Sequence, residues 1–111
     1  MSKKSVRAEF RDAVFGRDKH QCRMCGAVGL DLDAHHITNR NDMPGGGYVA
    51  ENGISLCEAC HRLAEQLWET GTAAPGFTPD DLYRVIGSSH QKALRASERR
   101  FQSPEERREQ G

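Results

Sequence analysis

Apolar residues near the start of the chain recur at helical spacing. A helix over residues 6–15 gathers one set of apolar side chains on a single side, namely Val6, Phe10, Ala13 and Val14. Gly16 follows directly, and glycine is typical of the position after a helix. The pattern therefore predicts an amphipathic N-terminal helix within residues 1–16.

Between residues 28 and 37 the apolar residues recur at every second position instead of at helical spacing. The apolar members of this stretch are Val28, Leu30 and Leu32. They alternate with polar positions that include Asp31 and Asp33, which favours a short strand or hairpin with one buried face. Residues 39–47, rich in asparagine, glycine and proline types, then predict a loop.

Helical spacing returns after this loop. Residues 58–69 predict a second helix, and its expected buried side comprises Leu63, Leu67 and Trp68. Thr78 and Pro79, followed by two aspartates, have the composition of a capped helix start. We expect this helix to reach about residue 99, with a break near residues 87–89 and a frayed, charged tail after Ser103.

Composition limits the size of the core and excludes some classes of protein. The chain has 111 residues, of which 36% are hydrophobic and 6% aromatic, so a metal or disulfides would add needed stability. The formal net charge is zero, and total charge therefore does not indicate a nucleic-acid binder. No signal peptide or membrane-length apolar run is recognisable, so we expect a cytoplasmic protein without a membrane partner.

The four cysteines form two Cys-x-x-Cys pairs, Cys22 with Cys25 and Cys57 with Cys60. Each pair offers half of a tetrahedral site, so together they predict one structural Zn²⁺. Two disulfides are the alternative, and a reducing compartment disfavours them. The run that ends in His61 also fits the Cys-x-x-Cys-His pattern of haem attachment, but that interpretation leaves the first pair without a role.

Histidines and an asparagine are arranged around the cysteine pairs in a specific order. The relevant residues are Arg17-Asp18, His35-His36-Ile37, Gly45-Gly46-Gly47, Asn52, Leu56 and Cys60-His61. In this order they resemble the HNH endonuclease family over about residues 17–67. The resemblance implies an α+β fold with a small zinc-stapled ββα-metal core over residues 17–70. A helix over residues 1–16 and a helical extension with its tail over residues 71–111 would flank that core.

The resemblance also implies roles for individual residues. His36 would be the general base, and a neutral imidazole is suited to deprotonate water near pH 7. Asn52 and His61 would complete the catalytic set. The implied ligands of one catalytic divalent ion are His35, His61 and Asn52. That ion would be Mg²⁺ or Mn²⁺, with Ni²⁺ or Zn²⁺ also acceptable to imidazole ligands.

One geometric condition applies to the histidine pair. Neighbouring residues on a regular strand point to opposite faces. His35 and His36 can therefore serve one phosphate only if they lie at a strand end or at a bulge.

The implied function is a metal-dependent endonuclease that hydrolyses phosphodiester bonds of DNA, by nicking or double-strand cleavage, with low sequence specificity. The candidate phosphate contacts are Arg17, Arg23, Arg40 and Arg62. A basic N-terminal arm offers a further phosphate-facing surface, and it contains Lys3, Lys4, Arg7, Arg11, Arg17, Lys19 and Arg23. The alternative is a non-catalytic zinc module that binds nucleic acid or a partner, for example within a phage DNA-packaging assembly. Such a module has no need of His36, Asn52 and His61, so these residues favour the nuclease.

Overall fold

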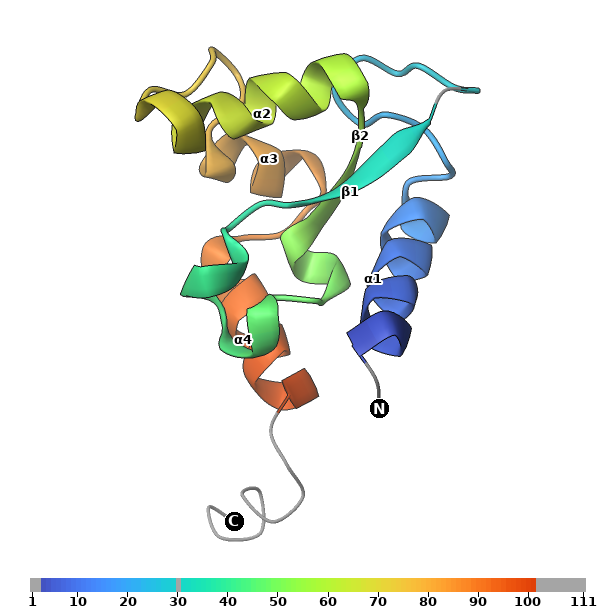
Figure 1. The fold of residues 1–111 in the computed structure, drawn as a ribbon, viewed down its shortest axis with the longest axis vertical. Helices are drawn as coiled ribbons and strands as arrows, with labels where there is room; N and C mark the ends of the chain where they lie inside the picture. The colour runs from blue at the N-terminus through green and yellow to red at the C-terminus, as the bar shows by residue number, and fades with distance from the viewer. Residues whose placement is uncertain (1–2, 30, 102–111) are drawn as a thin grey trace, which may run out of the picture.

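The computed structural model describes residues 3–29 and 31–101 (Figure 1). Its helices and strands are, in order, α1 (Lys3–Arg17), β1 (Leu32–His36), β2 (Gly53–Cys57), α2 (Glu58–Thr70), α3 (Pro79–Val85) and α4 (His90–Phe101). Between the strands lie three short 3₁₀ turns, η1 (Arg40–Asp42), η2 (Pro44–Gly46) and η3 (Ala50–Asn52). The protein is thus α+β, with a two-stranded antiparallel sheet, and the predicted fold class is confirmed.

The sheet brings together two segments of different character. β2 pairs with β1 from Cys57 opposite Leu32 to Gly53 opposite His36, and every residue of β2 is buried. A strand buried on both faces shows no alternation, which explains why the sequence pattern did not reveal β2. Of the predicted alternating stretch, only the end forms β1. Leu30 lies outside the described residues, and Val28 is exposed and joined only to Gln21 by an isolated bridge.

Helix α1 packs against the sheet through Phe10 and Val14, both of which are buried. Gly53 makes this approach possible, because a Cβ atom there would lie 2.5 Å from Val14 Cγ2 and 2.7 Å from Phe10 Cζ. Ala13 was predicted for the same side, but it is exposed. The contact therefore follows a narrower stripe of α1 than the apolar pattern suggested.

Helix α2 packs on both strands, but not through the side that its large residues predicted. Its buried residues are Cys60 and Ala64, whereas Leu63 is 40% exposed and Trp68 is 39% exposed. The prediction of Leu63 and Trp68 as a buried side was therefore wrong. The cysteine cluster fixes the start of α2, and small residues let the helix approach the sheet closely.

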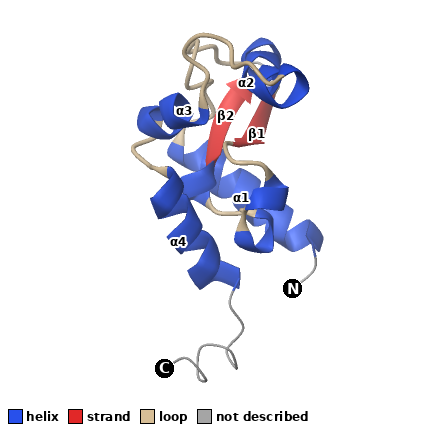
Figure 2. Cartoon of the chain, turned by 90° about the vertical axis from the view of Figure 1, so that its left-hand side faces the viewer, coloured by secondary structure: helices blue, strands red, loops and turns tan. Residues whose placement is uncertain are grey.

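Helices α3 and α4 complete the core rather than forming a separate unit. Thr78 caps α3 as predicted, Asp81 completes a capping box with it, and Leu82 and Tyr83 of α3 are buried. Helix α4 supplies Ala93 and Ser97 to the interior and packs against the turns η2 and η3. Figure 2 shows α4 below α3 and the sheet. The predicted break near residues 87–89 separates the two helices. The predicted frayed tail lies outside the described residues. None of the described helices has the length and apolar character needed to cross a membrane.

Candidate zinc centre and active site

The four cysteines meet at the start of α2. Their Sγ atoms all lie within 4.8 Å of one another, and Cys25 Sγ lies 3.7 Å from Cys57 Sγ. Four sulfurs at Zn–S distances of about 2.3 Å in a tetrahedron are separated by about 3.8 Å, so this cluster fits zinc. All four cysteines are free thiols rather than disulfides. The arrangement supports the predicted structural Zn²⁺ on Cys22, Cys25, Cys57 and Cys60.

The environment of the cluster prepares one thiol for metal binding. Burial raises the pKa of Cys22, but hydrogen bonds from the backbone of Cys25 and Cys57 outweigh it and bring the pKa to about 6. Burial and the neighbouring Cys57 raise the pKa of Cys60. Zinc binds thiolates, so Cys22 offers a ligand in the required form at neutral pH.

The two adjacent histidines of β1 face different helices. His35 faces α2, where its ring stacks on Trp68 with centroids 5.0 Å apart and meets His61 edge-on at 5.1 Å. His36 faces α1, where its ring stacks on Phe10 with centroids 4.4 Å apart. This is the alternation expected of a regular strand.

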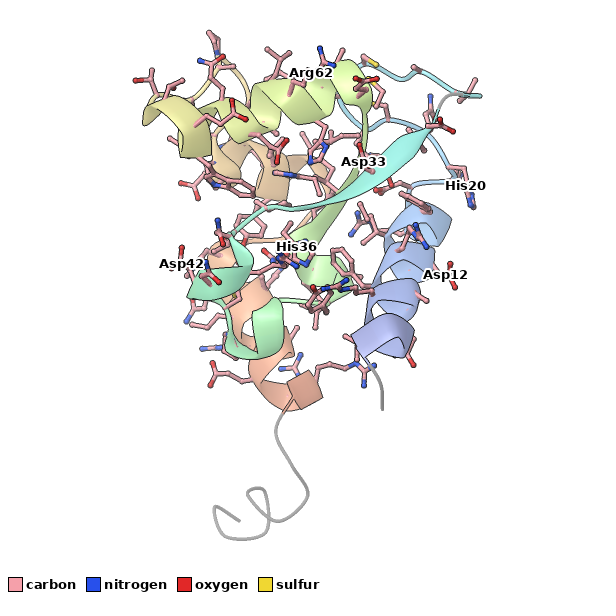
Figure 3. The ribbon with its side chains drawn as sticks, in the orientation of Figure 1. Asp12, His20, Asp33, His36, Asp42 and Arg62 are labelled. Carbon is pink, nitrogen blue, oxygen red and sulfur yellow. The ribbon has the colours of Figure 1, made fainter. Side chains whose placement is uncertain are left out.

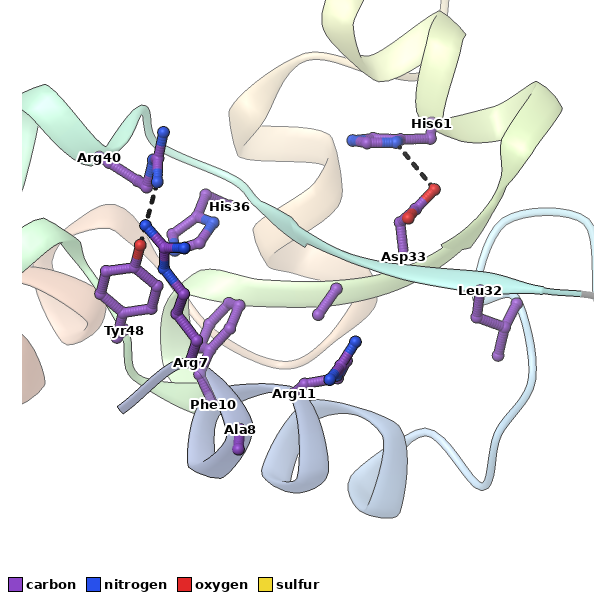
Figure 4. A pocket seen from close by; sticks show the side chains of 11 residues that line it. Arg7, Ala8, Phe10, Arg11, Leu32, Asp33, His36, Arg40, Tyr48 and His61 are labelled. Carbon is purple, nitrogen blue, oxygen red and sulfur yellow. Dashed lines mark hydrogen bonds and ion pairs between the residues drawn. The ribbon is translucent and has the colours of Figure 1, made fainter. Parts of the chain in front are cut away.

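The two histidines nevertheless line one groove, because His36 is the last residue of β1 and, within the described residues, β1 pairs with β2 alone and has its other edge free. Two hollows, of about 580 Å³ and about 360 Å³, lie beside this edge. They share four lining residues, Ala34, His36, Arg40 and His61. We call the pair of hollows the edge groove; Figure 4 shows its larger part, with His36 on one side and His61 on the other. From the sequence, His35 and His36 required a strand end or a bulge to serve one phosphate, and the structure provides a strand end.

His36 is in the neutral form, which a general base requires. Burial, and next to it the positive charge of Arg40, lower the pKa of His36 to about 4, so its ring is neutral near pH 7. Its Nε2 atom is buried and has no hydrogen-bond partner among the described residues. A buried polar atom without a partner is uncommon in a folded protein, and a catalytic role or a bound group would account for it. Figure 3 shows His36 between the strands and the turns, at the centre of the fold.

His35 has the protonation state of a metal ligand. Its side chain is almost fully buried, at 3% exposure. Burial, followed by the charges of His61 and His36, lowers its pKa to about 3. A neutral imidazole is the form that coordinates an ion.

Two carboxylates accompany His61. Asp33 Oδ2 lies 3.1 Å from His61 Nδ1 (Figure 4). Glu65 Oε1 lies 3.8 Å from His61 Nε2. A carboxylate on one ring nitrogen fixes the tautomer and leaves the other nitrogen for an ion. Glu65 follows His61 by one helical turn, so both side chains project from the same side of α2. Sequence reasoning missed Asp33 and Glu65, although the i,i+4 spacing was a usable signal.

The donor set around His61 is looser than the cysteine cluster. Within the described part of the chain, the cysteines are the one group of three or more ligand atoms gathered within 4.8 Å. His35, His61 and Glu65 nevertheless line the same part of the edge groove. Two imidazoles and a carboxylate are a donor set that suits Mn²⁺, Ni²⁺ or Zn²⁺, and it is therefore a candidate site for the catalytic ion.

Asn52 lies in the interior, away from the lining of the edge groove. Its Oδ1 accepts hydrogen bonds from the Thr38 backbone N–H at 3.0 Å and from the Tyr83 hydroxyl at 2.7 Å. Its Nδ2 donates to the carbonyl oxygens of Thr38 and Gly47, both at 3.2 Å. The side chain is fully buried, and these four bonds use its complete hydrogen-bonding capacity.

The candidate phosphate-contacting arginines are divided by the fold. Arg17 and Arg23 both bond to the buried carboxylate of Asp18, and each also donates to backbone carbonyls. Arg62 is exposed on α2 and pairs with Glu58. Arg40 lines the edge groove, where it is joined by Arg7 and Arg11 of α1. His20 and His90 are exposed, as expected of surface histidines.

Comparison with known proteins gives a match to a protein family. Residues 22–66 match the family model described as HNH endonuclease. This segment includes all four cysteines and the three histidines of the edge groove. Searches of curated proteins and of solved structures find no significant match.

Proposed function

Residues 22–66 belong to the HNH endonuclease family, and on this premise we propose that the protein is a metal-dependent endonuclease. Its substrate is DNA, in which it hydrolyses phosphodiester bonds by nicking or by double-strand cleavage. One observation carries the proposal. A neutral histidine with an unpartnered buried nitrogen, His36, lies in the same groove as an imidazole pair, His35 and His61. Phosphodiester hydrolysis requires both a base and a divalent ion, and the groove supplies residues for each.

His36 is the proposed general base. Its low pKa keeps the ring neutral over the physiological range, so a lone pair is available to take a proton from a water molecule. Phe10 and Tyr48 hold the ring on two sides, at centroid distances of 4.4 Å and 4.8 Å. This packing limits the rotation of the ring and keeps the accepting nitrogen in one place.

His35 and His61 are the proposed ligands of the catalytic ion, and we add Glu65 to this set. When bound, such an ion stabilises negative charge on the phosphate and on the leaving oxygen. Asp33 accepts a hydrogen bond from Nδ1–H of His61 and so leaves Nε2 free for the ion. The imidazole content of the set favours Mn²⁺, Ni²⁺ or Zn²⁺ over Mg²⁺.

Asn52 acts in this proposal as a positioning residue and does not ligate the ion. All of its hydrogen-bonding capacity is used within the protein, which leaves no donor or acceptor for an ion or a substrate. Its two bonds to Thr38 hold the backbone two residues beyond His36. The proposed contribution of Asn52 is therefore the fixed position of the base.

Conversion of supercoiled plasmid tests the function. Wild-type protein is expected to nick DNA when Mn²⁺, Ni²⁺ or Mg²⁺ is added, and not in EDTA. His36→Ala should lower the rate about 10²- to 10⁴-fold, because a general base contributes an acceleration of that order. His90→Ala, a change at an exposed histidine outside the groove, should cleave like wild type.

The same assay decides between the two candidate functions. Absence of cleavage with every ion, in protein shown to be folded and to contain zinc, would contradict the nuclease proposal. The same absence of cleavage would favour the alternative function. This alternative is a non-catalytic zinc module that binds nucleic acid or a partner, such as a component of a phage DNA-packaging assembly.

A further inference from the structure

The arginines of the chain fall into two groups according to their partners. Among the side chains that the structure describes, ion pairs with carboxylates occur at Arg17, Arg23, Arg62, Arg84 and Arg100. None of these pairs involves Arg7, Arg11 or Arg40, the three arginines that line the larger part of the edge groove. Among the described side chains, these three guanidinium groups therefore lack a carboxylate counter-charge, which an anionic ligand could supply.

Their positions surround the proposed base. Arg7 and Arg11 are one turn apart on α1, so they project from the same side of the helix, with an axial offset of about 6 Å. Phe10 of this helix stacks on His36. Arg40 extends from η1 and lies near His36 as well (Figure 4).

Tyr48 joins Arg7 to Arg40. Arg40 Nη1 donates a hydrogen bond to the Tyr48 hydroxyl at 3.0 Å. Burial raises the pKa of Tyr48, but hydrogen bonds and charge from Arg40 and Arg7 outweigh it and leave the pKa below its usual value. Two guanidinium groups thus converge on one phenol oxygen, an arrangement that a bound anion would stabilise.

The charge of the groove is not balanced from within. The lining of its larger part contains three arginines and one carboxylate, Asp33, which is already bonded to His61. The chain as a whole has zero formal net charge, so the positive field is a local property of this groove. A surface with an excess of positive charge concentrates anionic ligands.

We propose that Arg7, Arg11 and Arg40 bind consecutive phosphates of the DNA substrate, with Arg7 and Arg40 on the phosphate beside His36. Tyr48 is the positioning residue that holds Arg7 and Arg40 together. Arg11, one turn along α1, contacts the neighbouring phosphate. This inference rests on the proposed nuclease function and adds α1, which lies outside the segment that matches the family, to the substrate site.

The test is the salt dependence of binding to a short, fluorescein-labelled DNA duplex, measured by anisotropy without added divalent ion. Each phosphate contact adds about one unit to the slope of log affinity against log salt concentration. Arg7→Gln, Arg11→Gln and Arg40→Gln should each weaken binding and lower this slope by about 1. Arg84→Gln removes the same charge from an exposed position on α3 and should leave both quantities unchanged.

Several outcomes are decisive. Unchanged slopes in the three groove variants, with zinc content and thermal midpoint equal to wild type, would overturn the proposal, as would absence of salt-dependent binding by wild type. If a glutamine variant fails to fold, Arg→Lys at the same position is the substitute. It should retain the slope and lose affinity, because lysine keeps the charge but not the planar fork.

Cleavage separates this inference from the proposed function. Wild type that binds through the three arginines but cuts with no ion would leave the phosphate contacts standing and remove the nuclease. If the wild type cuts DNA and the arginine variants bind and cut equally well, the nuclease function stands and the proposed phosphate contacts are wrong. Tyr48→Phe should lower affinity with an unchanged salt slope, because it removes a hydrogen bond and no charge.

Discussion

The side-chain amide of Asn52 bonds to both backbone groups of Thr38, accepting from its N–H at 3.0 Å and donating to its carbonyl at 3.2 Å. The amide thus behaves like one more residue of a strand, and it continues the pairing of the sheet past His36. The Tyr83 hydroxyl adds a third bond from α3. The position of the proposed base is consequently tied to a helix far along the sequence.

Asn52→Ala should destabilise the domain by about 2–4 kcal/mol, because it leaves several buried donors and acceptors without partners. Urea unfolding measures this loss. Asn41→Ala, at an exposed position in η1, is the matched control and should have little effect. If Asn52→Ala keeps full stability and zinc but loses cleavage, the residue has a direct catalytic role and the positioning proposal is incorrect.

Cys57→Ala should prevent stable folding at neutral pH. Cys57 offers one of the four thiolates for zinc and stands where β2 ends and α2 begins, so its loss releases both elements from the cluster. Circular dichroism and zinc content, compared with wild type, check this expectation. A folded, zinc-free and active variant would show that the cluster is not structural.

Trp68 should report occupancy of the proposed catalytic ion site. It is the single tryptophan of the chain and stacks on His35 with centroids 5.0 Å apart. Titration of zinc-loaded protein with Ni²⁺, a quenching ion, should lower tryptophan fluorescence saturably. His61→Ala should weaken this response strongly, whereas His90→Ala should preserve it. Equal titration curves for wild type and His61→Ala would place the ion elsewhere.

Asp18→Asn should cost about 3 kcal/mol of stability, because it leaves two guanidinium groups without their buried counter-charge. The Asp18 side chain is inaccessible to solvent and accepts bonds from Arg17, Arg23 and the Ser55 backbone N–H. Burial alone would raise its pKa, but these donors keep the pKa below its usual value. Chemical denaturation of this variant beside Asp12→Asn, an exposed aspartate on α1, provides the measurement. Equal loss in the two variants would contradict a structural role for the network.

Local patterns predicted the parts of this molecule that are locally determined. The helix over α1, the capped start at Thr78 and the break before His90 all follow from neighbouring residues, and the structure has each of them. The cysteine cluster was also predictable, because two identical short motifs needed no knowledge of the path between them. The assignments of His35, His36 and His61 came from a resemblance, and their proposed roles remain to be tested.

The features that were missed depend on contacts between distant segments. All four arginines at positions 7, 11, 17 and 23 belong to the same basic segment of the sequence. Arg17 and Arg23 nevertheless point toward the interior, because both pair with the buried carboxylate of Asp18. Leu63 was expected inside, but the position of α2 is fixed by Cys60 and not by its largest apolar residue. The partnership of Asn52 with Tyr83 joins segments 31 positions apart and leaves no trace in either one alone.

The free edge of β1 has a consequence for how a substrate can reach the proposed site. A pocket closed on all sides accepts only the end of a polymer or a small molecule, whereas a channel around an edge can be entered from the flank. The two hollows share His36 and His61, so a continuous strand can lie across them without being threaded. Such an entrance suits attack on internal bonds and imposes no requirement for a free terminus.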